Sequence, residues 1–265
     1  MSMQSDLLMG LVAHPHGGVA VDHRKTTKDS EIVTMPPPKK VQIPVKQHVG
    51  VPGEPVVSVG DEVYRGQVIA DSDAALSVPI HASISGKVTK IGDIPTASGF
   101  HTTIIEITSD RKMAWDPAIK PPEIPDLPSF LKAIRASGLV GLGGAGFPAF
   151  YKLDLPQHTE VDTLIINAAE CEPFITVDYR TSMEETQHIL DAIEVLAHFL
   201  KIKKIILAIE DNKPDAVQKF LRIAEKHPQG NKEMRVASLP SRYPQGAEKV
   251  LIYAVTGRVV EAGKL

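Results

Sequence analysis

Cysteine is almost absent from this sequence, and the shortage limits the chemistry that the chain can hold by itself. Cys171 is the single cysteine among 265 residues. One thiol forms no disulfide within a chain, and it cannot supply the sets of cysteine ligands that zinc sites and iron–sulfur clusters use. A disulfide framework and a self-contained Cys-ligated metal site are therefore excluded.

The sequence also lacks an excess of one charge and long apolar runs. The net charge is −3, so no basic excess favours nucleic acid as a partner. No apolar run approaches the roughly 18–20 residues of a membrane-spanning helix, and the first ten residues lack the features of a secretory signal. With 43% hydrophobic and 23% charged residues, the composition is typical of a globular protein. We expect a cytoplasmic protein with no membrane span and no nucleic-acid partner.

Short β-branched segments separated by glycine turns fill the region between Val41 and Thr108. Closely spaced segments of this kind predict a small all-β sandwich or barrel. The predicted strands are residues 56–59, 67–70, 86–91 and 102–107. A proline-rich stretch at residues 117–128 then predicts a linker. The expected parts of the chain are an N-terminal module over residues 1–115, a linker over residues 116–128 and a second domain over residues 129–265.

Strand and helix patterns alternate after this linker. A continuous apolar run at residues 162–168 is typical of a strand buried on both faces. The sequence Thr-Ser-Met-Glu at residues 181–184 is a capping box and predicts the start of a helix. The other predicted elements are helices over residues 129–136 and 212–225 and strands over residues 204–209 and 234–239. This order predicts a parallel sheet with right-handed crossovers, in a Rossmann-like, doubly wound α/β domain.

The β module resembles the barrel-sandwich of biotinyl and lipoyl carriers. The resemblance rests on residues 59–63, 66–70, 78–82 and 85–88. In those carriers an exposed hairpin bears the lysine to which the prosthetic group is attached. The corresponding hairpin here, residues 71–77, has no lysine. Without an amine no amide to biotin or lipoate can form, so we expect a scaffold or docking module.

A glycine-rich segment, Gly-Leu-Gly-Gly-Ala-Gly-Phe-Pro at residues 141–148, is the first candidate for ligand binding. Its spacing satisfies G-x-G-x-x-G, but a helix rather than a buried strand is predicted before it. No Gly-Lys-Ser/Thr ends the segment, so a Walker-type phosphate loop is excluded. Four glycines let the backbone approach a ligand closely and offer several N–H donors. A ligand-binding loop and a tight packing joint both remain open.

Polar residues at and just beyond the carboxyl end of the strand at residues 162–168 are the second candidate. Asn167, Glu170 and Glu172 come at its carboxyl end, where open α/β sheets bind ligands. A carboxylate accepts hydrogen bonds from ribose or ribityl hydroxyls, and an asparagine offers both a donor and an acceptor. Alternatively, these residues cap the segment that follows. Lys152, shortly after the glycine segment, could neutralise a phosphate or lie at a surface.

Together, residues 141–148 and the sequence Asn-Ala-Ala-Glu-Cys-Glu-Pro at residues 167–173 resemble the C subunit of the Rnf electron-transport complex. They are also similar to the electron-transfer protein associated with proline reductase and, more distantly, to the NADH-oxidising flavoprotein subunit of respiratory complex I. Residues 44–50 and 243–249 are similar to the Rnf-type members as well. A β module placed before the flavin domain favours the Rnf-type branch.

The resemblance implies an electron-transfer flavoprotein subunit that works between NAD(H) and FMN and delivers electrons to iron–sulfur partners. It implies no catalytic side chain and no metal ligand in this chain. The partners would be other subunits of a membrane-bound complex and ferredoxin or a similar one-electron acceptor, on the inner face of the plasma membrane. The residues implied to contact FMN are Gly141, Gly143, Gly144, Gly146, Lys152, Asn167 and Glu170. Those implied to contact NADH or complete the site are Phe147, Glu172, Tyr243, Gly246 and Glu248.

Three departures from the family pattern bear on these expectations. Ala169 stands where the complex I relatives have an aspartate, and residues 17–22 differ from the Gly-Gly-Val-His-Pro-Pro of Rnf-type members. The iron–sulfur segment of the family is also lacking, so we expect a truncated chain or a shortened homologue. The alternatives are a docking or assembly module with a vestigial flavin site, an electron-transfer protein for an amino-acid reductase, and a corrin or flavin reductase. The domain order argues against the last.

Overall fold

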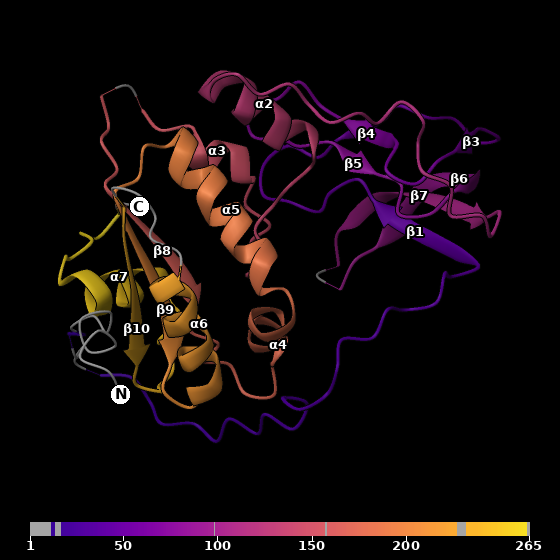
Figure 1. Cartoon of the computed structure of the whole chain (residues 1–265). Coiled ribbons are helices and arrows are strands. Elements are labelled where there is room, and N and C mark those ends of the chain that lie inside the picture. Colours follow the sequence, from indigo (N-terminus) through magenta and orange to yellow (C-terminus); the bar gives the residue numbers. More distant parts are fainter. Residues whose placement is uncertain (1–11, 14–16, 98, 157, 227–231, 264–265) are drawn as a thin grey trace. The chain divides into compact units, whose positions relative to one another are not determined.

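The computed structural model describes residues 12–13, 17–97, 99–156, 158–226 and 232–263 (Figure 1). Its contacts divide into two compact units. Thr34–Thr159 form a β-rich unit, and Glu160–Leu265 form an α/β unit together with the described residues up to Val33. The sequence pattern instead predicted parts at 1–115, 116–128 and 129–265. Contacts place residues 116–159 with the β strands, and they place the described residues of the first 33 with the α/β unit.

The β-rich unit contains two antiparallel sheets, of four and three strands, that enclose one apolar core. Ile69, Val88, Ile105 and Ile107 are completely buried in it. The strands of the first sheet, in order, are β1 (Lys40–Pro44), β7 (His101–Ser109), β6 (Gly86–Pro95) and β3 (Glu62–Val63). Those of the second are β2 (Glu54–Pro55), β4 (Val68–Asp71) and β5 (Ile80–His81). Three of the four predicted strands are therefore present.

The prediction of a strand at residues 56–59 is wrong. The Val56 N–H donates to the Ile69 carbonyl at 2.9 Å, which extends the pairing of β2 with β4 by one residue. The chain then turns, with the Asp61 N–H bonded to the Ser58 carbonyl and Gly60 at a φ of +105°. Alternating valines are also compatible with a turn whose side chains face solvent, and Val59 is exposed.

Two helices complete the β-rich unit, α2 (Leu127–Ala136) and α3 (Ala149–Leu153). Asp126 caps α2 by accepting the Ser129 N–H at 2.9 Å, which places the start of the helix just before the predicted residue. At the other end of α2, the Arg135 guanidinium donates to the Asp71 carboxylate at 3.0 Å and the Ser72 carbonyl at 2.6 Å. These two residues begin the hairpin that holds the lysine in carriers. A helix tied to a lysine-free hairpin supports the scaffold interpretation.

The α/β unit is built on a parallel three-stranded sheet in the order β10-β9-β8. The strands are β8 (Thr163–Ala168), β9 (Lys204–Glu210) and β10 (Glu233–Leu239). The helices are α4 (Val177–Glu184), α5 (Thr186–Phe199), α6 (Pro214–Lys226) and α7 (Glu248–Thr256). Alternate residues of the central strand face opposite layers: Ile205, Leu207 and Ile209 pack with α5 and α6, whereas Ile206 and Ala208 pack with α7. The predicted parallel α/β architecture is confirmed.

Three details of the α/β prediction need correction. The described strands follow one another in sequence order across the sheet, without the reversal that defines a doubly wound sheet. Strand β8 lies at the edge of this sheet and is only partly buried, although its apolar run predicted burial on both faces. The predicted capping box at residues 181–184 lies in the last turn of α4, and the next helix begins at Thr186.

The start of α4 explains why the capping box was wrong. The Asp178 N–H, in the first turn of α4, donates to the Glu170 carboxylate at 2.8 Å. This acceptor lies eight residues earlier in the sequence, outside the local pattern that defines a capping box. Glu184 instead forms an i,i+4 ion pair with Arg180 inside α4. A residue outside the local pattern therefore caps the start of α4.

Candidate functional site

The glycine loop, residues 141–146, projects from a narrow base in the β-rich unit. The Gly141 N–H donates to the Phe147 carbonyl at 2.9 Å, and Val140 pairs with Pro148 in an antiparallel bridge. Above this base residues 141–145 are exposed, and Leu142 exposes 96% of its surface. The loop therefore presents backbone to its surroundings.

Two glycines of this loop differ in whether close packing explains why the residue is a glycine. A Cβ on Gly146 would lie 2.7 Å from the Gln47 carbonyl oxygen, so Gly146 is needed for close packing on the neighbouring chain. A Cβ on Gly143 would meet no atom of the described structure within 4 Å, and its φ is not in the left-handed region. Packing within the described residues therefore explains Gly146 but not Gly143. An open backbone segment of this kind fits a flat ring or phosphate laid against it.

The residues just after the glycine loop form a short aromatic group. The rings of Phe147 and Tyr151 are 6.0 Å apart, edge to face at 71°. Phe147 is half-buried, and Lys152 is exposed in α3. The structure thus places the predicted Phe147 and Lys152 immediately beside the loop in the same unit.

In the α/β unit, the end of β8 and the loop before α7 come together. The Asn167 amide donates to the Gly246 carbonyl at 2.9 Å, and its Oδ1 accepts the Ala169 N–H at 3.1 Å. A Cβ on Gly246 would lie 2.3 Å from the Ala169 carbonyl oxygen, so only glycine fits there. The Gly246 N–H points to the buried Cys171 sulfur at 3.5 Å. Two predicted site residues 79 positions apart therefore touch directly.

Glu170 has a structural role that the sequence left open as an alternative. Its residue surface is 2% exposed, and one carboxylate oxygen caps α4 through Asp178. Burial raises the pKa of Glu170, although the Asp178 N–H and the nearby Lys25 oppose the change. Its other oxygen, Oε2, has no hydrogen-bond partner in the described part of the chain. The interpretation as a cap is confirmed, and a contact of Glu170 with flavin stays a prediction.

The remaining predicted residues lie at the rim of the α/β unit. Glu172 is exposed beside the end of β8, and Glu248 is the first residue of α7. Tyr243 is 43% exposed and pairs with Val19 through two backbone hydrogen bonds of 2.8 and 2.9 Å. The glycine loop belongs to the β-rich unit and these residues to the α/β unit, so a common cleft stays a prediction.

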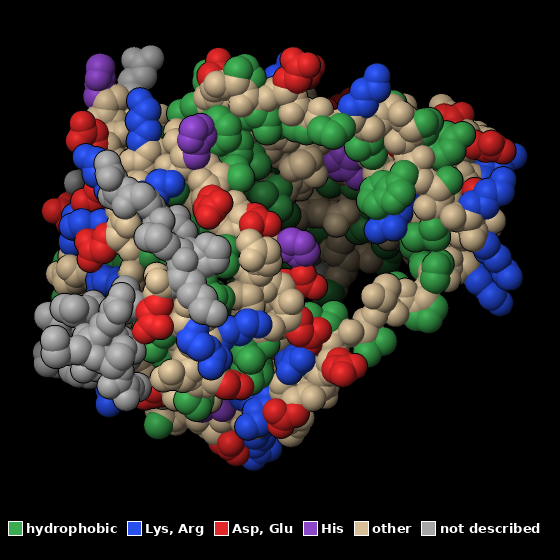
Figure 2. Space-filling model, in the orientation of Figure 1, with side chains coloured by type: hydrophobic (Ala, Val, Ile, Leu, Met, Phe, Trp, Pro, Cys, Tyr) green, Lys and Arg blue, Asp and Glu red, His purple; other side chains and the backbone are tan. Residues whose placement is uncertain are grey.

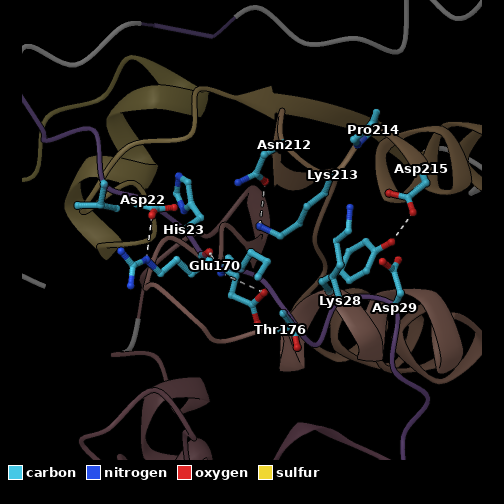
Figure 3. Close-up of a pocket in the computed structure, with 14 residues that line it drawn as sticks. Asp22, His23, Lys28, Asp29, Glu170, Thr176, Asn212, Lys213, Pro214 and Asp215 are labelled. Atoms are coloured by element: carbon cyan, nitrogen blue, oxygen red, sulfur yellow. Dashed lines mark hydrogen bonds and ion pairs between the residues drawn. The ribbon is translucent and has the colours of Figure 1, made fainter.

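An N-terminal strap, defined here as residues 17–33, lies across the carboxyl edge of the parallel sheet (Figure 1). It encloses a pocket of about 760 Å³ against the ends of β8 and β9 and the start of α6. Figure 3 shows Asp22, His23, Lys28 and Asp29 of the strap facing Glu170, Thr176, Lys213 and Asp215 across this space. The charges that line it are balanced, with Arg24, Lys25, Lys28 and Lys213 opposed to Asp22, Asp29, Glu170 and Asp215.

Lys25 makes the densest set of contacts in this pocket. Its ammonium donates to the carbonyls of Glu170, Glu172 and Ile175 at 2.8, 2.9 and 2.5 Å. The side chain is 12% exposed and lies 3.6 Å from Glu170 Oε2. Burial lowers the pKa of Lys25, while the Glu170 carboxylate acts in the opposite direction. A second ion pair, Lys213 with Glu210 at 2.9 Å, is buried at the end of β9.

The turn that Lys25 grips contains a strained aromatic residue. Phe174 has a φ of +69° and is 60% exposed. Bulky residues rarely adopt this left-handed conformation, which costs on the order of 1–3 kcal/mol. The Phe174 N–H donates to the His23 carbonyl at 2.8 Å, so the strap holds the strained residue as well. Such strain concentrates at functional sites.

Sequence reasoning did not identify Lys25, Lys213, Thr176 or Tyr179. The argument that found Asn167, polar residues just after a buried strand, could also have found Asn212 and Lys213 after β9. No local signal marks Lys25, because its partners lie 145 to 150 residues away.

Charge and metal chemistry give little further guidance. Acidic and basic side chains are interspersed on the face that Figure 2 shows. Among the described residues no group of three His, Cys, Asp or Glu could hold a metal ion. His14 and His16, whose spacing in the sequence would let them pair as metal ligands, lie outside the described residues. Within those residues, no helix combines the length and hydropathy of a bilayer-crossing segment.

Comparison with known families matches the two halves of the chain separately. The Nuo51 FMN-binding domain matches residues 134–265, which include both the glycine loop and the polar residues Asn167, Glu170 and Glu172. The RnfC barrel sandwich hybrid domain matches residues 13–112. An FMN-binding type of domain therefore follows a barrel sandwich, as the sequence predicted.

Curated relatives match nearly the whole chain. The C subunit of the proton-translocating ferredoxin:NAD(+) oxidoreductase complex of Clostridium ljungdahlii is 43% identical over 94% of this chain and 54% of its own length. The C subunit of the Na(+)-translocating complex of Acetobacterium woodii is 37% identical over 94% of this chain and 56% of its own length. The chain thus spans about half the length of these relatives.

A solved structure shares a more limited likeness. The crystal structure of an NAD+-reducing [NiFe]-hydrogenase in the air-oxidized state has 25% identity and a TM-score of 0.45. The match covers 50% of this chain and 24% of that one. On the family matches and the curated relatives, the chain belongs to the family of C subunits of Rnf electron-transport complexes.

Proposed function

We propose that this chain binds FMN and NAD(H) and transfers electrons between them on behalf of iron–sulfur partners in an Rnf-type complex. The observation that carries the proposal is the open backbone at Gly143, in a loop that lies within the match to an FMN-binding domain. The relatives' names, which describe ferredoxin:NAD(+) oxidoreductases, support NAD(H) and ferredoxin as the two redox partners. Attachment to the inner face of the membrane would come from other subunits.

The residues of this chain would bind and orient the cofactors. FMN supplies, when bound, the capacity to exchange a hydride with NAD(H) and single electrons with iron–sulfur centres. The glycine loop would offer its backbone N–H groups, and the Lys152 ammonium would neutralise phosphate. Asn167 is exposed and keeps one N–H and one lone pair beyond those used with Gly246 and Ala169. Glu172, also exposed, would accept hydrogen bonds from the hydroxyl groups of NADH. Phe147, Tyr243 and Glu248 would complete the site.

An FMN titration of the wild-type chain and of Gly143→Ala tests this proposal. The added methyl meets no atom of the described structure, so we expect the melting temperature to change by less than about 2 °C. It would occupy the backbone face that FMN needs, so we expect the FMN dissociation constant to rise about tenfold or more. Flavin fluorescence quenching measures the affinity, and NADH should bleach the bound flavin absorbance.

Gly92→Ala is the matched control, because Gly92 lies in the same unit and its Cβ would meet only the end of the Lys90 side chain at 3.6 Å. We expect it to leave FMN affinity unchanged. A wild-type chain that takes up no FMN would contradict the proposal and favour the docking alternative. That alternative has one observation in its favour: Glu170, implied to contact flavin, is engaged as a helix cap.

A further inference from the structure

The Lys25 ammonium uses all its donors on one turn of the α/β unit. A lysine has three N–H donors, and the three acceptors of Lys25 are the carbonyls of Glu170, Glu172 and Ile175. These carbonyls span six consecutive residues after β8. Because one nitrogen binds all three, the ends and the middle of the turn are fixed relative to one another. The Glu170 carboxylate, 3.6 Å away, balances the charge.

Other residues of the strap also bind this turn and the helix that follows it. The His23 carbonyl accepts the Phe174 N–H at 2.8 Å, and the hydroxyls of Thr27 and Thr176 are 2.7 Å apart. Further along, the Arg180 guanidinium donates to the Lys28 carbonyl at 3.0 Å. The strap therefore binds the turn at several points, with Lys25 at the centre.

The outward side of the gripped turn presents the groups suited to a ligand. The carbonyl of Glu172 binds Lys25, whereas the residue itself is exposed. Phe174, in its strained conformation, is 60% exposed two residues later. An exposed carboxylate can accept hydrogen bonds from the hydroxyl groups of a nucleotide, and an exposed aromatic ring offers a flat face to its rings. A strained turn keeps its conformation only if contacts with the surrounding structure hold it in place.

We propose that Lys25 is a positioning residue for NAD(H), which holds the turn of residues 170–175 so that Glu172 and Phe174 face the dinucleotide. This inference rests on the proposed function. In this proposal Lys25 does not contact the ligand, because its three N–H groups donate to backbone carbonyls of the turn. The benefit is preorganisation, since a turn that is already ordered loses less conformational freedom when the ligand binds.

The test compares Lys25→Met with Lys28→Met in the FMN-loaded full chain. Both variants remove one positive charge from the strap, but Lys28 is an exposed side chain whose backbone carbonyl serves Arg180 in either case. Stopped-flow bleaching of flavin at increasing NADH yields an apparent dissociation constant and a limiting rate. For Lys25→Met we expect the apparent dissociation constant of NADH to rise about tenfold, with less than threefold change in FMN affinity. For Lys28→Met we expect the affinities for NADH and for FMN to stay within twofold of wild type.

Hydrogen exchange provides a readout that does not depend on cofactor. We expect the Phe174 amide to exchange at least tenfold faster in Lys25→Met than in wild type, and to stay unchanged in Lys28→Met. A Lys25→Met chain with wild-type NADH affinity overturns the inference, as does an equal loss in both variants. If NADH does not bleach the flavin bound to the wild-type chain, the proposed function is contradicted, and the inference that rests on it fails as well.

Lys25→Arg keeps the test decisive if Lys25→Met does not fold. Arginine retains the charge, but no single nitrogen of its planar fork can donate to three carbonyls. We expect the apparent dissociation constant of NADH to rise about threefold or more, with FMN affinity maintained. Wild-type affinity for NADH in Lys25→Arg overturns the inference.

Discussion

At the scale of single residues, the buried carboxylate of Glu170 connects the fold with the site. It caps α4 through Asp178 and balances Lys25, which holds the adjacent turn. Its Oε2 lacks a hydrogen-bond partner in the described residues, which agrees with the raised pKa that burial causes. Burial therefore outweighs the charge of Lys25, which acts to lower the pKa of Glu170.

This raised pKa predicts how stability depends on pH. The folded chain keeps the Glu170 proton above the ordinary value of 4.5, where the unfolded chain has lost it. The folded state then binds more protons, so the free energy of unfolding falls as pH rises from 4.5 through the raised pKa. We expect Glu170→Gln to make this decline shallower in urea unfolding measured from about pH 4.5 to 7.5.

Part of the decline should survive in Glu170→Gln. Burial and the charge of Glu172 also raise the pKa of Asp178, which contributes a slope of the same sign. Glu194→Gln, an exposed change on α5, should keep the full wild-type slope. An unaltered slope in Glu170→Gln would contradict a raised pKa of Glu170 in the folded chain.

At the scale of elements, a tyrosine joins two helices that border the strap pocket. Tyr179 of α4 is 9% exposed, and its hydroxyl donates to the Asp215 carboxylate at the start of α6. Burial, with the Asp215 bond and charge next, raises the pKa of Tyr179 to about 12. The Lys219 ammonium of α6 also donates to the Met183 carbonyl of α4. Polar contacts therefore help to fix the orientation of these helices.

Tyr179→Phe removes the hydroxyl and leaves the ring. We expect a loss of about 1 kcal/mol of unfolding free energy, typical of one net hydrogen bond, measured by urea unfolding at pH 7. An absorbance titration at 295 nm should lose a tyrosine that ionises near pH 12. Tyr151→Phe, at a site 49% exposed, should change stability by less than about 0.5 kcal/mol. Equal stability of both variants would contradict a stabilising bond.

At the scale of the whole molecule, the two compact units cross the boundaries that the sequence pattern suggested. The apolar core of the β-rich unit lies entirely between residues 34 and 159, and α2 is tied to it through Arg135 and Asp71. The strap, although N-terminal, completes the α/β unit through Lys25 and Val19. A fragment that respects these contacts should therefore be the more stable one.

Two fragments test this division. We expect residues 34–159 to unfold in one cooperative thermal transition, because they contain the core and the helix packed on it. Residues 1–115, the module expected from sequence, lack α2 and its buried Phe130 and should melt at least about 5 °C lower. Circular dichroism and scanning calorimetry measure both. Equal melting temperatures would contradict the contact-based division.

Local sequence patterns by themselves determined the β-rich and α/β halves, the parallel sheet and the two candidate ligand segments. Residue alternation, helical spacing and glycine runs act over a few residues, so elements such as β9 and α6 are found where their own residues predict them. Tertiary structure alone decided the roles of Glu170 and Lys25. The Glu170 carboxylate accepts a helix N–H from eight residues later, and the sequence offered this cap only as one of two alternatives. Lys25 binds a turn about 145 residues later, which leaves no mark in its local sequence.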